Sequence, residues 1–494
     1  MEKHIIRFLN KMGFKAWVCG GAARDLYMQK IPTEWDIAVQ GTLAQIKTKL
    51  ASRITSISTY DTSITIQYND TKFILYPLKK VTLSNTYYNY EFTSSLLEDS
   101  NSRDFTINSL YYEPITEEWI DFHNGISDIH DKIIKFVGDG ATRILESKIR
   151  ILRCAVLHSL LGSEWKIEEE TVKSIKEHRL KISTVHSQQL RSELEKLFTR
   201  SEVPSNFFNT IRQLGISDQI LPEYTHTYGI PQSNKKEGLT LDRHIMYALD
   251  SVKIGRPNTL ILRLAALLHD IGKPQTQIIT DTGLHFYSHE NVGAILAERI
   301  LYRWGFPKKL SQKVVLLVKN HLFNIVACKS SASLKKFIGR VGEDNIHDLL
   351  DLRIADRWGT GRKDIKMTRV EQLRSRINAH LAVVAPEKFM LKISDEDLKS
   401  LLSNYTEFPE KALKEVKRYL EYKVLYGKLY NKKPNLKKAF YKINKIDCPL
   451  DKEHLFKTWA TLQTKSADLF TDGKLKCGLF CNFKCNSLRN EQKF

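Results

Sequence analysis

Glu34 and Asp36 stand on either side of Trp35, just after a glycine-rich turn, and this arrangement constrains the fold more than any other feature. The turn is the segment GGAARD at 20–25. Side chains of a strand alternate between faces, so Trp35 would face a core while both carboxylates stand on the opposite face. Carboxylates that close repel each other unless a cation joins them, and Mg²⁺ prefers such oxygen ligands together with phosphates. Because glycines let a backbone approach a phosphate and Arg24 can pair with one, we predict a site for metal and phosphate. The alternative is an acidic strand edge exposed to solvent.

The chain has 494 residues, more than one hydrophobic core supports, and this predicts about three or four domains. Its hydrophobic content of 42% is ordinary for a globular protein, and no apolar run approaches the roughly 18 residues that a membrane span needs. The first eight residues lack the apolar stretch and cleavage site of a signal peptide. We therefore expect no membrane partner and a cytoplasmic location. Oligomeric state cannot be read from the sequence.

The net charge of +20 is unevenly distributed. Residues 401–494 hold 20 lysines and arginines against 10 acidic residues, so half of the excess lies in this last segment. Tyrosines and phenylalanines alternate with the basic residues there, from Tyr419 to Tyr441. A basic and aromatic surface favours nucleic acid as a partner, and the alternative is a lysine-rich helix surface exposed to solvent.

The seven cysteines do not form a pattern typical of disulfide frameworks. Cys477, Cys481 and Cys485 are spaced C-x3-C-x3-C and would share one helix face. With Cys448 as a fourth ligand they could hold a metal, although this spacing matches no common zinc motif.

Periodicity predicts an α+β fold in which a small mixed sheet comes first and helices follow. Before residue 138 the expected helices are 3–12 and 20–28, and the expected strands are 15–19, 34–40, 63–68 and 72–78. From residue 138 nearly everything is expected to be helical, with apolar periodicity over 144–162, 167–178, 187–198, 204–214, 242–254 and 259–271.

Four ordered motifs in the first half resemble those of bacterial-type (class II) tRNA nucleotidyltransferases and poly(A) polymerases. They are GGAARD at 20–25 with PTEWDIA at 32–38, RDFTINSL at 103–110, DFHNGISD at 121–128 and RILESKIRILR at 143–153. The resemblance covers roughly residues 1–365. The segment after residue 365 resembles no family that we recognise.

The resemblance implies that Glu34 and Asp36 bind Mg²⁺ and activate the RNA 3′-hydroxyl for attack on the α-phosphate of CTP or ATP. It implies these nucleotide-binding residues: Gly20, Gly21, Arg24, Arg103, Asp104, Asn108, Arg143, Glu146, Arg150 and Arg153. Glu146, Arg150 and Arg153 recur at i, i+4 and i+7, so one helix would present them together to a base edge. A surface ladder of salt bridges is the alternative for that face.

Four positions depart from the family pattern. Glu34 stands where the family usually has Asp, and Ile74 where it often has an acidic residue on the next strand pair. Ser147 replaces the Asp that usually follows Glu146, and Val156 replaces a further arginine. The segment 79–92, where relatives place a loop for switching from C to A, is also a few residues short. These departures leave nucleotide choice and catalytic rate open, since misplacement by about 1 Å can cost about a hundredfold in rate.

A second group of residues resembles the HD phosphohydrolase superfamily, whose domains some tRNA nucleotidyltransferases carry. The His-Asp pair lies in the segment LLHDIGKP at 267–274. The six expected ligands are His244, His269, Asp270, His289, His321 and Asp356. Imidazoles and carboxylates bind transition metals, so the resemblance implies a phosphatase or 2′,3′-cyclic phosphodiesterase that uses Mg²⁺, Mn²⁺, Co²⁺ or Ni²⁺. Lone histidines are more often structural, but six in this order favour a metal site.

Together these features predict a template-independent RNA nucleotidyltransferase that adds CCA, or part of it, to tRNA 3′ ends from CTP and ATP. The expected domains are a nucleotidyltransferase head (1–137), a helical neck (138–236), an HD domain (237–365) and a basic helical tail (366–494). Neck and tail would bind the tRNA backbone. Three alternatives stay open: an HD phosphohydrolase with a degenerate head, a poly(A) polymerase of the same class, and a non-enzymatic RNA-binding protein.

Overall fold

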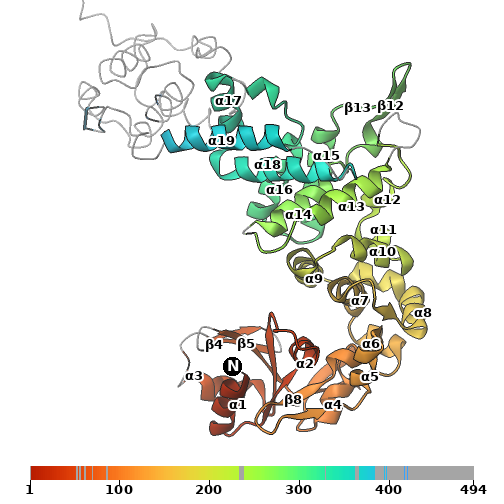
Figure 1. The fold of residues 1–494 in the computed structure, drawn as a ribbon. Coiled ribbons are helices and arrows are strands. Elements are labelled where there is room, and N and C mark those ends of the chain that lie inside the picture. The colour runs from red at the N-terminus through yellow and green to blue at the C-terminus, as the bar shows by residue number, and fades with distance from the viewer. Residues whose placement is uncertain are drawn as a thin grey trace, which may run out of the picture. The chain divides into compact units, whose positions relative to one another are not determined.

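The computed structural model divides the chain into two compact units (Figure 1). The first comprises Met1–Leu322 with Asp351–Ile365, and the second comprises Phe323–Leu350 with Lys366–Phe494. The residues that the structure describes are 2–51, 54, 57–60, 63–68, 71–84, 87–232, 239–256, 258–328, 330–361, 367–383, 394, 396, 397, 417 and 420. Most of the basic tail and its four cysteines therefore lie outside the described residues.

A seven-stranded mixed sheet forms the core of the N-terminal part, in the order β3-β4-β5-β2-β1-β8-β9. Its strands are β1 (Ala16–Cys19), β2 (Trp35–Val39), β3 (Ile57–Tyr60), β4 (Ser63–Tyr68), β5 (Thr71–Pro77), β8 (Tyr111–Glu113) and β9 (Glu118–Ile120). β2 runs parallel to β5 and antiparallel to β1, which places it near the middle. Trp35 and Ile37 are buried, as the alternation predicts.

Helices and one separate hairpin complete this region. The helices are α1 (Glu2–Lys11), α2 (Gly20–Tyr27), α3 (Leu43–Ala51), α4 (Leu96–Asn101), η1 (Thr106–Asn108) and α5 (Gly125–His130). The hairpin pairs β6 (Lys79–Ser84) with β7 (Tyr87–Phe92) and is a sheet of its own. The predicted strand at 63–68 is confirmed, whereas β2 begins at Trp35, so the prediction that Glu34 belongs to this strand is wrong.

The middle of the chain is mainly helical. Its elements are β10 (Ile133–Ile134), α6 (Gly140–Glu146), α7 (Arg150–Leu161), β11 (Lys166–Ile167), α8 (Glu169–His178), η2 (Arg179–Thr184), α9 (Ser187–Arg200), α10 (Ser205–Gln213), α11 (Ser217–Ile220) and α12 (Pro222–Thr225). The expected continuous helix at 144–162 is wrong, because Ser147 is extended and separates α6 from α7. A side chain takes part in this break, since Nη1 of Arg150 donates to the carbonyl of Arg143 at 2.8 Å.

The six expected metal ligands lie in a helical bundle within the first unit. Its elements are α13 (Leu241–Ser251), α14 (Thr259–Leu268), η3 (Pro274–Thr276), β12 (Gln277–Thr280), β13 (Gly283–Phe286), α15 (His289–Arg303), α16 (Lys308–Asn320) and the second half of α18 (Glu343–Trp358). The β12–β13 hairpin corrects the expectation of near-continuous helix. Ile278, Ile279 and Thr280 are β-branched, and a two-residue turn follows, which together favour a hairpin.

The second unit contains η4 (Val326–Cys328), α17 (Ser331–Val341), the first half of α18 and α19 (Thr368–Val383). Leu334, Phe337 and Ile338 of α17 are buried at helical spacing, and they form its apolar face. Among the described helices of both units, none is long and apolar enough to cross a membrane. The mixed sheet followed by helices confirms the predicted α+β class. The expected domain boundaries stay a prediction.

Candidate functional sites

Asp36 and Arg103 converge on the glycine-rich turn at the end of β1. An added Cβ at Gly20 would lie 3.3 Å from Oδ2 of Asp36 and 3.4 Å from Nη1 of Arg103. Gly20 also has a φ of +63°, which side chains rarely adopt. Gly21 follows in the first turn of α2, where an added Cβ would lie 3.6 Å from Nη2 of Arg24. The fold thus brings Asp36 of the first expected signature and Arg103 of the second to the backbone of Gly20, a position that favours glycine.

The two carboxylates expected to share a metal have different surroundings. Glu34 lies in a bend before β2 and pairs with Arg200 at the end of α9, with Nη2 2.8 Å from Oε1. Nη1 of Arg200 also donates to Oγ1 of Thr33 at 3.1 Å. Burial acts to raise the pKa of Glu34, but the hydrogen bond and charge of Arg200 outweigh it and lower the pKa. Glu34 therefore already has a cationic partner.

Around Asp36 the charges of Arg103, Lys196 and Arg24 do not outweigh the effect of burial. Burial first, and then the charge of Glu34, raise the pKa of Asp36 to about 6. A divalent cation beside Asp36 would remove this electrostatic cost, so the Asp36 carboxylate fits a divalent metal ion. Ile74, at the position where the resemblance implies an acidic residue, lies next to Asp36, because the two residues are in register between β5 and β2. An isoleucine cannot bind a metal, which leaves that neighbouring place without a ligand.

The expected phosphate-binding arginines are held by polar side chains. Oδ2 of Asp99 accepts from Nη2 and Nε of Arg103, at 2.9 and 3.1 Å. Nη1 of Arg24 donates to Oδ1 of Asn108 at 2.7 Å, and Nδ2 of Asn108 donates to Asp104 at 3.3 Å. The structure therefore links Arg24 of the first expected signature to Asn108 and Asp104 of the second, and Asp99 separately holds Arg103, so both guanidinium groups are fixed in place.

The expected base-reading residues are paired with one another across the break at Ser147. Oε1 of Glu146 lies 2.5 Å from Nη2 of Arg143, and Oε2 lies 2.5 Å from Nη1 of Arg150. The Glu146 and Arg150 side chains are buried. The predicted presentation on one continuous helix is therefore wrong, because the two residues belong to different helices. Glu146 acts as a bridge between two arginines instead.

Arg153 joins the neck to the second signature. Its Nη1 lies 2.8 Å from Oδ2 of Asp104, and its Nε lies 3.1 Å from Oε1 of Glu193 on α9. Burial acts to raise the pKa of Asp104, but Arg153 and Arg150 outweigh it and hold the pKa well below its usual range. Val156, where the resemblance implies a further arginine, is buried on α7.

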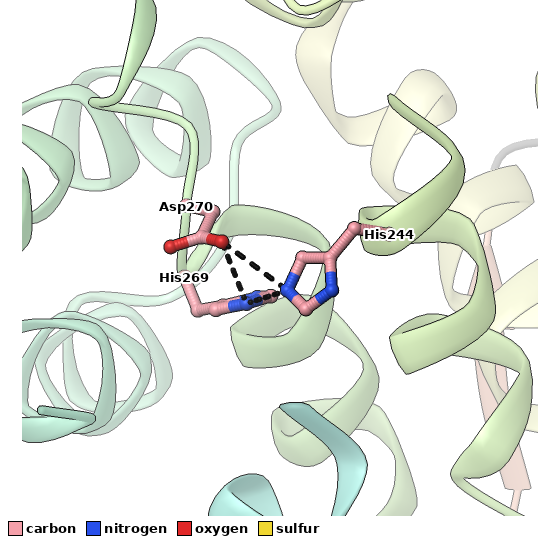
Figure 2. Close-up of side chains that lie close together, drawn as sticks. All are labelled: His244, His269 and Asp270. Carbon is pink, nitrogen blue, oxygen red and sulfur yellow. Dashed lines mark hydrogen bonds and ion pairs between the residues drawn. The ribbon is translucent and has the colours of Figure 1, made fainter. Parts of the chain in front are cut away.

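All six expected HD ligands come together in the bundle. Figure 2 shows His244 from α13 facing His269 and Asp270, which directly follow α14. Oδ2 of Asp270 lies 3.2 Å from Nε2 of His244 and 3.3 Å from Nε2 of His269. Oδ1 of Asp356 lies 3.3 Å from Nε2 of His244 and 3.7 Å from that of His269.

Asp270 has histidines on both sides. Its Oδ1 faces the other two histidines, with Nε2 of His289 at 3.3 Å and Nε2 of His321 at 3.6 Å. Within the described residues, two groups are close enough to hold an ion: His244 with His269 and Asp270, and Asp270 with His289 and His321. One carboxylate is therefore shared by two potential metal positions.

Three of the four imidazoles are oriented as metal ligands require. Nδ1 of His269 lies 2.8 Å from the carbonyl of Ala266, and His289 and His321 make equivalent contacts to carbonyls at 2.7 Å. A carbonyl only accepts, so Nδ1 carries a proton and Nε2 is the nitrogen left for a metal. Nε2 of His289 is buried and, among the described residues, accepts or donates no hydrogen bond. This donor set fits a divalent transition metal.

Charges around Asp270 hold it ionised. Nζ of Lys273 lies 2.6 Å from its Oδ2 and 3.1 Å from Oε1 of Gln232. Burial acts to raise the pKa of Asp270, but His269 and Lys273 outweigh it and hold the pKa well below its usual range. Burial acts to lower the pKa of His269, but Asp270 and Asp356 raise it to about 10. An ion that binds here must therefore displace a proton.

Several residues of these sites were missed by sequence reasoning. Arg200 lies 166 residues from Glu34, and nothing in the local sequence indicates the pairing. Glu193 and Asp99 likewise gain their roles only through the fold. Lys273 could have been found, because it follows the His-Asp pair by three residues, one helical turn away. The proposed cysteine site at 477–485 lies outside the described residues.

Comparison with known families matches three consecutive parts of the chain. Residues 16–135 match "Poly A polymerase head domain", residues 165–227 match "Probable RNA and SrmB- binding site of polymerase A", and residues 244–359 match "HD domain". The order is the one that the motifs predict. The matched head contains Asp36, and the matched HD region contains all six expected ligands.

Individual relatives agree with this assignment. The chain is 30% identical to the A-adding tRNA nucleotidyltransferase of Deinococcus radiodurans over 53% of its length, and 25% identical to the multifunctional CCA protein of Xylella fastidiosa over 47%. These matches span 60% and 55% of the relatives' own lengths. The crystal structure of the Bacillus stearothermophilus CCA-adding enzyme in complex with CTP shares the fold, with a TM-score of 0.58 and 17% identity over 94% of this chain and 98% of that one.

Proposed function

We propose that the chain belongs to the family of bacterial-type tRNA nucleotidyltransferases and poly(A) polymerases and that it adds CCA, or part of it, to the 3′ ends of tRNA. CTP and ATP would be the nucleotide substrates, and the reaction would need no template. The expected location is the cytoplasm.

The observation that supports this proposal best is the surroundings of Asp36. The carboxylate has a raised pKa and lies beside a glycine backbone and Arg103. A carboxylate of this kind binds a divalent ion, and the glycine backbone with an arginine suits a triphosphate.

In the reaction, Asp36 and Glu34 would hold Mg²⁺. The ion when bound neutralises phosphate charge and lowers the pKa of the RNA 3′-hydroxyl. Arg103 and Arg24 would orient the triphosphate, since their guanidinium groups are already fixed by Asp99 and Asn108. The 3′-hydroxyl oxygen would bond to the α-phosphorus while the bond to the β-phosphate oxygen breaks and pyrophosphate leaves.

Base choice would depend on the paired residues of the neck. Arg150 and Glu146 satisfy each other, and Ser147 supplies no charged acceptor. A base edge would then meet fewer fixed donors and acceptors than in relatives that carry the usual Asp. We expect weaker discrimination among CTP, ATP and UTP.

The decisive experiment uses purified full-length protein, tRNA that lacks its 3′ end, Mg²⁺ and each labelled nucleotide in turn. Wild type should incorporate C or A, and Asp36→Ala should lose incorporation because a metal ligand is removed. As a matched control, the double variant His269→Ala with Asp270→Ala should still incorporate. Incorporation by Asp36→Ala at the wild-type rate would refute the site assignment, and long A tracts would indicate a poly(A) polymerase instead.

A second activity is supported by the shared carboxylate of the bundle. Asp270 lies between two potential metal positions, and water activated by a bound ion attacks phosphoesters. We propose a metal-dependent phosphohydrolase that uses Mg²⁺, Mn²⁺, Co²⁺ or Ni²⁺. Residues His244, His269 and Asp356 would hold one ion with Asp270.

Metal analysis and hydrolysis assays test this second activity. Wild type should retain or rebind one of the four metals and hydrolyse 2′,3′-cyclic nucleotides or p-nitrophenyl phosphate. His269→Ala with Asp270→Ala should lose both properties, whereas Asp36→Ala should keep them. If wild type binds none of these ions and hydrolyses neither substrate, the six residues are a structural remnant.

A further inference from the structure

The β6–β7 hairpin has two unlike faces. Residues directly opposite in an antiparallel pair share a face, and the register pairs Val81 with Tyr90, Leu83 with Tyr88 and Lys79 with Phe92. The pairs on the other face are polar, since Lys80 lies opposite Glu91, with Nζ 3.9 Å from Oε2. We call the set of Val81, Leu83, Tyr88, Tyr90 and Phe92 the aromatic face.

Much of the aromatic face is open to solvent. Leu83 is 62% exposed, Phe92 43% and Tyr90 39%. The hairpin pairs with no strand of the seven-stranded sheet. Exposing apolar groups to water is unfavourable, and binding a partner removes them from water. An exposed apolar face of this kind is therefore typical of an interaction site.

The hairpin begins at the nucleotide site of the head. The backbone N–H of Lys79 donates to Oδ1 of Asp99 at 2.9 Å, and Oδ2 of the same carboxylate holds Arg103. Asp99 therefore connects the base of the hairpin to a guanidinium expected to bind phosphate.

Positive charge accompanies the aromatic rings. Nζ of Lys79 lies 4.2 Å from the centroid of the Tyr90 ring. Burial lowers the pKa of Lys79 to about 8, so its ammonium still carries a charge at neutral pH. Burial also lowers the pKa of Arg143, and the charge of Glu146 acts against this shift. Rings interspersed with cations suit a polyanion that offers flat bases, and they suit an apolar protein helix less well.

We propose that the aromatic face binds the unpaired 3′-terminal nucleotides of the RNA acceptor, with their bases stacked on Tyr90 and Phe92. This inference rests on the proposed nucleotidyl transfer and names the surface that positions its RNA substrate. Stacking tolerates any base, because every base has a π face, so the same surface can hold an end whose sequence changes with each addition. Lys79 contributes charge for the phosphates of that strand.

The test compares the two faces of one strand. Tyr90→Ala with Phe92→Ala removes rings from the aromatic face, and Tyr87→Ala removes a more exposed ring from the opposite face. Fluorescence anisotropy measures the Kd for tRNA that lacks its 3′ end, and steady-state incorporation measures KM for this RNA and for CTP separately. The double variant should raise the Kd and KM for RNA about ten- to a hundredfold, with KM for CTP unchanged. Tyr87→Ala should behave as wild type.

Two further variants separate stacking from packing. Tyr90→Trp keeps an aromatic ring and should retain RNA affinity, whereas Tyr90→Leu keeps apolar bulk and should lose it. If Tyr90→Leu binds RNA as wild type does, or the double variant leaves KM for RNA unchanged, the inference is wrong even though transfer is intact.

Other outcomes are equally decisive. A double variant that changes the oligomeric state in sedimentation, with RNA affinity unchanged, would assign the face to contact between copies and overturn the inference. Absence of incorporation by wild type with every nucleotide would refute the proposed function. RNA affinity measured on the same variants would still test the aromatic face.

Discussion

Replacing Asp36 by asparagine should stabilise the metal-free protein locally while abolishing nucleotide transfer. The pKa of Asp36 is raised to about 6 by burial and by Glu34. Its ionised form is thus disfavoured in the folded state, and asparagine keeps the shape without the charge. An active-site carboxylate of this kind trades stability for function.

The magnitude follows from the shift. A rise from 3.8 to about 6 costs at most about 3 kcal/mol at pH 7.5, because each pKa unit corresponds to about 1.4 kcal/mol. Asp36 keeps some exposure, so solvent screening reduces the expected gain from Asp36→Asn to about 1–2 kcal/mol. The folded state binds more protons than the unfolded state between pH 4 and 6, so the cost grows as pH rises through this window. Below pH 4 the Asp36 carboxyl is protonated in both the folded and the unfolded state, so its cost disappears. At pH 4.5 about a third of the stability gain from Asp36→Asn should remain.

Hydrogen exchange of peptides from β1 and β2 measures this local stability, since a multidomain chain has no single unfolding free energy. In EDTA, Asp36→Asn should exchange more slowly than wild type at pH 7.5, after correction for intrinsic rates, and the difference should shrink at pH 4.5. Added Mg²⁺ should protect wild type only. Asp104→Asn is the matched control, because the lowered pKa of Asp104 predicts the opposite sign. Faster exchange in Asp36→Asn, or a difference independent of pH, would refute the reasoning.

Three further predictions concern residues around the same site. Arg200→Ala should lower the free energy of unfolding by no more than about 1 kcal/mol, because its ion pair with Glu34 is partly exposed. The substitution frees Glu34, so it should lower the Mg²⁺ concentration needed for half-maximal incorporation. An unchanged Mg²⁺ titration would contradict this prediction. Gly20→Ala should destabilise the N-terminal region by about 1–2 kcal/mol, because Gly20 has a φ of +63°. The added methyl group would crowd Asp36, so the variant should lose incorporation. Retained activity would show that the close approach of Asp36 to the Gly20 backbone is unimportant. Ser147→Asp should sharpen selection for CTP and ATP over UTP in single-nucleotide assays, and a wild type that already rejects UTP by orders of magnitude would sink this idea.

The sequence by itself determined the local features. Alternation placed Trp35 in the core, and the run at 63–68 gave the bounds of β4, because periodicity within a few residues reflects which side chains face a core. The order of His244, the His-Asp pair and the later ligands indicated a shared site. Each of these ligands falls within or at the end of a helix, so a bundle could bring them together.

Only the tertiary structure decided how distant groups pair. Arg200 reaches Glu34 across 166 residues, and Asp270 lies between two sets of histidines because four helices converge on it. The break in the helix at Ser147 could not be predicted either, because the apolar periodicity continues through it. At this break the Arg150 guanidinium donates a hydrogen bond to the carbonyl of Arg143. Spacing constrains which face a residue occupies, but the partner on that face depends on long-range packing, which local sequence does not encode.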